Sequence, residues 1–279
     1  MDRRKFVKST LFMGSVIGGV IPLKNSVAFM ENEKDKKHEK DTMQEKNKKQ
    51  QWYELRTYIF ASDAQRQLTG AYLEQSALPA LNRAGIGNVG VFSEWQPQGM
   101  GKLFLLIPFD SIESFAAING KLAHDAAYLK AGEAYLSAPP DNPAYERIES
   151  SLLRAFLHMP LIEAPEKKER LFELRCYESP SEAAGQKKIE MFNEAGEIDV
   201  FKKIGAKPVF FGETIIGEHR PNLTYMLCFD NMEAHDARWK AFGSDPEWKK
   251  ISAMPEYSDA RLISKITRTF LAPTGYSQV

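Results

Sequence analysis

The sequence has few cysteines and lacks the compact motifs that mark common metal sites. Its two cysteines, Cys176 and Cys228, stand 52 positions apart, with no CxxC pair and no neighbouring histidine at ligand spacing. A metal site needs more ligands than this spacing offers, so none is predicted. Two interpretations of the cysteines stay open: a disulfide in an oxidising compartment, or two buried free thiols in β-strands.

Motifs for several classes of enzyme are also absent from the sequence. There is no HExxH pair, no glycine-rich phosphate loop, no Ser-His-Asp order and no close pair of catalytic carboxylates. These absences argue against hydrolases, kinases and nucleotide-binding proteins, and no cofactor is predicted. The five histidines are scattered, and His158 is the one whose place at a strand end could bring it to the mouth of the predicted fold.

An excess of positive charge is missing as well. The whole chain carries 37 basic and 37 acidic residues. Residues 1–28 have a charge of +4 and residues 29–50 a charge of +1, which leaves −5 for the body because the chain sums to zero. A body of this charge has no basic footprint for nucleic acid or anionic lipid, so neither is an expected partner.

No hydrophobic run is long enough to span a bilayer stably. Residues 2–8, DRRKFVK, resemble the twin-arginine export signature, and a modest apolar run follows over residues 11–21. Small residues at 26–28 fit a peptidase site. We therefore expect residues 1–28 to be a cleavable signal peptide of an exported, periplasmic protein without a stable membrane anchor, read by either the twin-arginine or the general secretory route.

The segment after this signal is charged and almost free of apolar residues. Between residues 31 and 50 the only apolar side chain is Met43. Such a segment cannot offset its ordering entropy by burial, so residues 29–50 are predicted to be a disordered tether. Folded structure is expected to begin near Trp52.

The body contains one pattern written twice, about 120 residues apart. YELRTY at residues 53–58 recurs as FELRCY at residues 172–177. Further matches follow in the same order along both halves, and an ordered series of this kind argues against coincidence: Gly85 with Gly205, Val89 with Val209, Phe109-Asp110 with Phe229-Asp230, and Asp125 with Asp245. We predict two repeats, over residues 51–160 and 170–273.

Each half reads as strand, helix, strand, strand, helix, strand, which is the order of a ferredoxin-like unit. Gly85 and Gly205 follow the first helices, where a helix end favours a left-handed residue. The predicted fold class is therefore α+β, with two β-α-β-β-α-β repeats packed sheet to sheet as a single-chain α/β barrel. The expected strands are 52–59, 88–95, 102–109, 150–158, 171–177, 207–216, 223–229 and 261–271, and the expected first helices are 63–84 and 182–204.

The Glu-Leu-Arg-x-Tyr strand, the Phe-Asp before the second helix and the Asp…Trp after it resemble the NIPSNAP family of the dimeric α/β-barrel superfamily. The resemblance covers residues 52–158 and 171–271. It implies the barrel fold more than a function, because the biochemical activity of the family is poorly defined. The superfamily also includes cofactor-free oxygenases and haem-degrading enzymes.

Strand alternation predicts which side chains enter the barrel. We assign Tyr53, Leu55 and Thr57 to the helix-facing side of the first strand, which turns its other face toward the opposite sheet. The resulting candidates for the barrel interior are Glu54, Arg56, Tyr58, Arg154, His158, Glu173, Arg175, Tyr177 and Arg268. Two interpretations compete: same-face ion pairs that fix how the sheets dock, or a pocket for a small anionic or aromatic ligand.

The sequence therefore favours an exported module that binds a small molecule or a protein, as a monomer or homodimer. The alternative is a cofactor-independent oxygenase- or isomerase-like enzyme that acts on a small aromatic or anionic substrate. A third hypothesis is a protein-binding surface on the outer helices, where Trp239 and Trp248 could be partly exposed.

Overall fold

The structure is a computed structural model, and it describes residues 49–279. The predicted signal peptide (1–28) and nearly all of the predicted tether (29–50) lie outside the described residues. Within the part that is described, no helix is long and apolar enough to cross a membrane.

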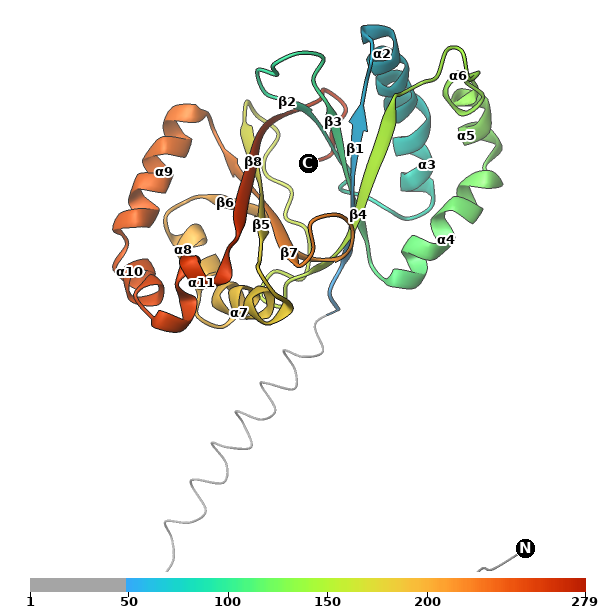
Figure 1. The fold of residues 1–279 in the computed structure, drawn as a ribbon. Coiled ribbons are helices and arrows are strands. Elements are labelled where there is room, and N and C mark those ends of the chain that lie inside the picture. The colour runs from blue at the N-terminus through green and yellow to red at the C-terminus, as the bar shows by residue number, and fades with distance from the viewer. Residues whose placement is uncertain (1–48) are drawn as a thin grey trace, which may run out of the picture. The chain divides into compact units, whose positions relative to one another are not determined.

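Eight antiparallel strands close into a barrel (Figure 1). Around the barrel the order is β1-β3-β2-β8-β5-β7-β6-β4. The first half of the chain supplies β4-β1-β3-β2 and the second half supplies β8-β5-β7-β6, and the pairs β2–β8 and β4–β6 join them. The strands are β1 (Trp52–Ile59), β2 (Gly90–Glu94), β3 (Leu103–Phe109), β4 (Arg147–Ala155), β5 (Leu171–Glu178), β6 (Lys207–Ile216), β7 (Asn222–Phe229) and β8 (Lys265–Pro273).

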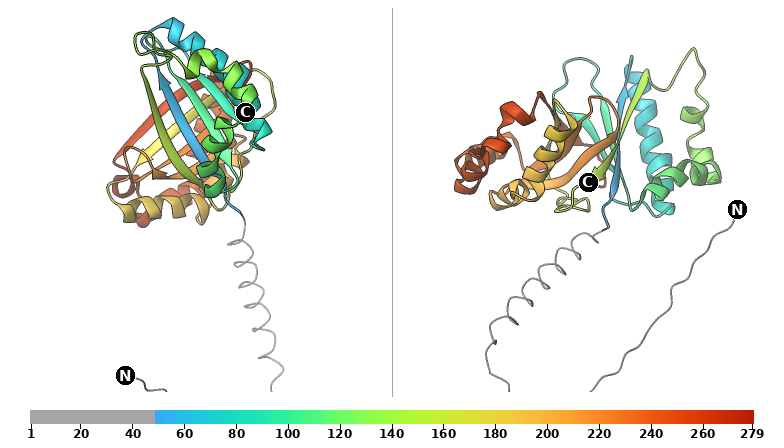
Figure 2. Two further views of the ribbon diagram at one scale, coloured as in Figure 1. Left: turned by 90° about the vertical axis from the view of Figure 1, so that its right-hand side faces the viewer. Right: turned by 60° about the horizontal axis from the view of Figure 1, so that its bottom comes forward.

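The helices cover the outside of the barrel, with α2–α6 beside β1 and β4 and α7–α11 beside the strands of the second half (Figures 1 and 2). The protein is thus a mixed α/β fold. The helical elements are α2 (Asp63–Tyr72), η1 (Leu73–Ala77), α3 (Leu78–Arg83), α4 (Ile112–Ala123), α5 (Ala126–Ala131), α6 (Glu133–Leu136), α7 (Glu182–Asn193), α8 (Glu197–Lys203), α9 (Met232–Ser244), α10 (Pro246–Ser252), η2 (Pro255–Tyr257) and α11 (Asp259–Leu262).

Local chemistry explains where these helices begin and end. The first long helix of each half starts at a serine whose hydroxyl accepts a backbone N–H three residues later, Ser62 before α2 and Ser181 before α7. Gly85 and Gly205 follow the helices with φ of +89° and +76°, which confirms the predicted left-handed ends.

Several expected elements differ from those observed. The predicted helix 182–204 is split at Gly196, whose φ of +92° ends the α7 region before α8 starts. The predicted helix 63–84 runs through, but five residues of it, η1, have π-helical bonding. The last predicted strand, 261–271, starts late because α11 occupies its first residues.

Three apolar clusters make up the core. One lies between the first-half strands and their helices, a second between the second-half strands and theirs, and a third fills one end of the barrel. Leu105, Phe211 and Phe172 are members of the first, second and third cluster respectively. This third cluster closes the barrel at one end, so the other end is the one where a cavity can form.

Candidate functional site

The first strands present their side chains one residue out of phase with the prediction. Leu55 and Thr57 line the barrel cavity and Tyr53 belongs to the cluster inside the barrel, whereas Tyr58 packs with the helices. The predicted placement of the charged residues inside the barrel is therefore wrong. Both faces of these strands are covered, one by helices and one by the opposite strands, so alternation defines two faces without saying which one is inside.

In the first half, Glu54 and Arg56 form an ion pair on the helix side of β1. The Arg56 Nη2 atom lies 2.9 Å from Glu54 Oε2, and the Ser150 hydroxyl on β4 donates to Glu54 Oε1 at 2.9 Å. The pair is therefore satisfied within its own half.

The second half repeats this pair and adds partners from α9. Glu173 is fully buried; it accepts from Arg175 Nη1 at 3.2 Å and from Trp239 Nε1 at 2.9 Å. His235 Nε2 lies 3.3 Å from the same carboxylate, and the Trp239 ring lies 4.3 Å from the Arg175 guanidinium carbon. These contacts use Trp239 inside the fold, which weakens the hypothesis of an exposed tryptophan docking surface.

The remaining predicted site residues lie apart from one another. Tyr177 is buried beneath the helices and shares a hydrogen bond of 2.9 Å with Tyr225. Arg154 pairs with Glu213 at 2.8 Å, and His158 is half-buried, with its backbone N–H donating to Asn193. Arg268 points away from the cavity, into a separate groove. The structure therefore does not gather the predicted residues into one site.

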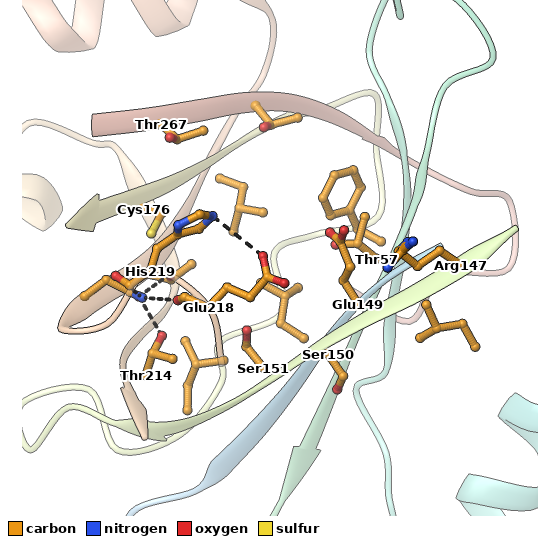
Figure 3. A pocket seen from close by; sticks show the side chains of 18 residues that line it. Thr57, Arg147, Glu149, Ser150, Ser151, Cys176, Thr214, Glu218, His219 and Thr267 are labelled. Carbon is orange, nitrogen blue, oxygen red and sulfur yellow. Dashed lines mark hydrogen bonds and ion pairs between the residues drawn. The ribbon is translucent and has the colours of Figure 1, made fainter. Parts of the chain in front are cut away.

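The open end of the barrel instead forms a cavity of about 420 Å³ (Figure 3). Its size is within the usual range for small-molecule sites. The walls carry apolar side chains from four strands, Leu55, Phe104, Leu153 and Leu174.

Hydroxyl groups from five strands also line this cavity, and four of these groups are of particular interest. Thr57 comes from β1, Ser151 from β4, and Thr267 and Thr269 from β8. Among residues 49–279 none of these four hydroxyls has a hydrogen-bond partner in the protein, whereas the neighbouring Thr214 hydroxyl is bonded to Asn222 at 2.6 Å. The four are thus available to a molecule in the cavity.

The rim of the cavity is charged and includes the β6–β7 hairpin. Arg147, Glu149, Glu218 and His219 lie here, and the His219 Nε2 atom is 3.7 Å from Glu218 Oε2 (Figure 3). Asn222 holds the hairpin by donating to the carbonyls of Glu218 and His219 at 3.0 and 3.1 Å. An imidazole beside a carboxylate at the mouth could exchange a proton with a bound molecule.

Both cysteines are free thiols. Cys176 lines the cavity, where burial raises its pKa, so the thiol is neutral near pH 7. Burial raises the pKa of Cys228 to about 11. Within the described part of the chain, no group of three or more His, Cys, Asp or Glu side chains is arranged to hold a metal ion.

Sequence reasoning missed most of the cavity lining. It assigned Thr57 to the opposite face and did not single out Thr267 or Thr269. The sequence does contain one indication of this lining. In Ile-Thr-Arg-Thr-Phe at residues 266–270 two threonines alternate with larger side chains, so both threonines lie on one face of the strand.

Comparisons with known proteins found one family model that matches part of the chain, and solved structures with a similar fold. A family model described as NIPSNAP matches residues 172–278, which include β5 to β8; the first half, for which the same resemblance was expected, is outside this range. No curated protein shows a significant match.

Among solved structures, a protein from Lactobacillus acidophilus NCFM described as a "putative monooxygenase" has a TM-score of 0.53 at 10% identity, covering 80% of this chain and 94% of its own. One with the same description from Fusobacterium nucleatum has a TM-score of 0.53 at 7% identity, covering 81% and 93%. A NIPSNAP-like domain protein from Burkholderia xenovorans has a TM-score of 0.35 at 17% identity, covering 39% and 89%. At these identities, the two similarities with a TM-score of 0.53 concern the fold alone.

Proposed function

We propose that the barrel binds a small organic molecule, with a flat apolar skeleton and hydroxyl or carbonyl groups in the cavity. The observation that carries this proposal is a set of four hydroxyls, of Thr57, Ser151, Thr267 and Thr269. They have no hydrogen-bond partner in the described part of the chain, and they share a space of about 420 Å³ with apolar side chains. These hydroxyls are accessible in the cavity, and each can donate one hydrogen bond to a ligand and accept others. Apolar walls with a few converging polar groups are typical of ligand sites.

The structure gives less support to an anionic ligand held by arginines inside the barrel. Arg56, Arg154 and Arg175 lie outside it, each in an ion pair with a glutamate. Among residues 49–279, Arg147 is the one basic side chain other than His219 that lines the cavity, and Glu149 and Glu218 accompany it. The part of the ligand within the cavity is therefore expected to be uncharged.

A fluorescence titration with 2-naphthol, a flat hydroxylated probe, tests the binding function. Leu174→Trp should block the cavity because Leu174 is buried in its wall. Ile266→Trp is the matched control, since Ile266 is 43% exposed on the outer face of neighbouring β8. We expect saturable binding by the wild type and the control and at least a tenfold loss for Leu174→Trp, which corresponds to about 1.4 kcal/mol. Equal binding by all three proteins would count against the cavity as the site.

A second candidate function is cofactor-free oxygenation of the bound molecule. It is supported by the fold shared with the structures described as monooxygenases and by His219, which with Glu218 could take a proton from a substrate at the rim. Oxygen uptake with electron-rich phenols tests it. Oxygen uptake that is abolished by His219→Gln would support the enzymatic function. If the protein binds 2-naphthol but takes up no oxygen, the enzymatic function is excluded and the binding function remains.

The proposal also covers the repeat structure of the chain, its oligomeric state and its export. We infer that the two halves are copies of one NIPSNAP-like ferredoxin-type unit, supported by their recurring motifs and by their matching strand order, and that the barrel acts as a monomer or homodimer. Residues 1–28 are proposed to direct export to the periplasm. The mature protein should then begin at Phe29 when its mass is measured, and replacing Arg3 and Arg4 by Lys should stop export only if the twin-arginine route is used.

A further inference from the structure

A second groove adjoins the cavity at the open end of the barrel. It has a volume of about 490 Å³ and lies between the end of β1, the β2–β3 hairpin and β8. Thr269 lines both spaces. The two spaces therefore adjoin at this residue.

Arg268 in this groove differs from the other arginines that were predicted as site residues. Arg56, Arg154 and Arg175 each contact a glutamate within 3.2 Å. Within residues 49–279, Arg268 has no carboxylate within 4.0 Å and no hydrogen bond from its guanidinium group, although it lines the groove. An exposed guanidinium group on a concave surface offers five N–H donors to an anion.

The register of the barrel adds to the positive charge at this point. Arg268 stands directly opposite Arg175 in the β5–β8 pair, and like charges at such positions repel each other. In the first half the corresponding position opposite Arg56 is Ser150, which donates a hydrogen bond to Glu54. The second half thus has an additional cation on β8, because the buried Glu173 already binds Arg175 and Trp239. The carboxylate that lines the groove, Glu94, accepts the backbone N–H of Lys102 and forms no ion pair with Arg268.

The groove also has an aromatic wall beside Arg268. Trp95 is 36% exposed, and its ring lies 6.2 Å from that of Phe270 in an edge-on arrangement. The backbone N–H of Trp95 donates to the carbonyl of Phe270 at 2.8 Å, which fixes the hairpin against β8. A guanidinium group next to exposed rings is suited to a planar group that carries a carboxylate.

From these contacts we propose that the groove binds the carboxylate end of the same molecule whose uncharged part occupies the barrel cavity. The ligand is then an aromatic carboxylic acid. Arg268 binds its carboxylate, and Trp95 and Phe270 contact the adjoining ring. This inference rests on the proposed binding function and names the class of its ligand.

Paired titrations of the full-length protein with 2-naphthoate and 2-naphthol test the inference, because the two probes share a ring system and differ in charge. The variants are Arg268→Gln, Arg268→Lys and, as a control that removes one exposed positive charge elsewhere, Arg261→Gln. We expect Arg268→Gln to weaken 2-naphthoate binding about tenfold, as for the loss of one charge-assisted contact. Its affinity for 2-naphthol should stay unchanged. Arg268→Lys should retain part of the 2-naphthoate affinity, and Arg261→Gln all of it.

The outcomes separate the inference from the function on which it rests. If 2-naphthol binds but 2-naphthoate binds no more tightly and ignores Arg268→Gln, the groove is not the carboxylate site and the cavity still is a binding site. If Arg261→Gln weakens 2-naphthoate as much as Arg268→Gln, the effect is one of overall charge and the inference fails. If neither probe binds to the wild type, both the inference and the cavity function fail.

Discussion

Replacing Glu173 by Gln should destabilise the fold without changing the cavity. The carboxylate is fully buried on the helix side of β5 and binds Arg175 and Trp239. Gln has nearly the same shape, and its amide oxygen can still accept the Trp239 N–H. What it removes is the negative charge that compensates Arg175, whose side chain is only 13% exposed.

The size of this effect follows from the burial of the pair. Breaking a buried ion pair from one side costs about 3–5 kcal/mol, because a buried charge is left without a partner. The retained Trp239 hydrogen bond places Glu173→Gln near the lower end, at about 3 kcal/mol. The equivalent Glu54→Gln should cost less, about 1–2 kcal/mol, since Arg56 is 25% exposed and can turn toward water.

Urea unfolding of both variants, followed by circular dichroism, measures these differences as shifts of the midpoint at an unchanged slope. Titration with 2-naphthol should give each folded variant the affinity of the wild type. A Glu173→Gln protein as stable as Glu54→Gln, or one that stays folded but loses the probe, would refute the assignment of this pair to the helix side.

Two further predictions concern buried groups on either side of the barrel. Lys188 is 1% exposed, and its Nζ lies 3.3 Å from the carboxylate of the buried Glu197. Lys188→Met should therefore lower the free energy of unfolding by about 3–5 kcal/mol, and adding Glu197→Leu should recover most of this loss in a double-mutant cycle measured by urea unfolding. Additive losses would contradict the coupling of the two residues. Burial raises the pKa of Cys228 to about 11, so its neutral thiol contributes stability that is complete below the pKa of the unfolded chain, near 8.5, and is lost as the pH rises through about 11. Cys228→Ser should therefore flatten the decline in stability across that range, and an unchanged alkaline profile would exclude this thiol as a cause.

Local residue chemistry was enough to predict most of the elements. The serine caps of the helices and the left-handed conformations of Gly85 and Gly205 depend on neighbouring residues alone, and there prediction and structure agree. The boundaries were less accurate where a break depends on the surrounding fold, as at Gly196 between α7 and α8.

The site was harder to predict, for a physical reason that β1 illustrates. Tyr53 inside the barrel and Tyr58 beneath the helices are 0% and 1% exposed, so the strand has no solvent face to orient it. Glu173 and Arg175 pair with each other, and their further partners, Trp239 and His235, lie more than 60 residues away on α9. No pattern within the strand contains that information, and the choice of the wrong face placed the charged residues of β1 and β5 inside the barrel instead of on its helix side.

The threonines that line the cavity were hard to predict for the same reason. Thr267 and Thr269 are ordinary strand residues by propensity, and their importance comes from the strands that lie opposite them across the barrel. Arg268 between them was identified from the sequence, although the structure places it in the groove outside the cavity.

The most direct test of the central claim is a crystal structure of the protein with 2-naphthol bound. The account predicts ring density against Leu55, Phe104 and Leu174, with the hydroxyl group within hydrogen-bond distance of at least one of Thr57, Ser151, Thr267 and Thr269. A barrel interior filled by its own side chains, or a probe bound only on the outer helices, would contradict it.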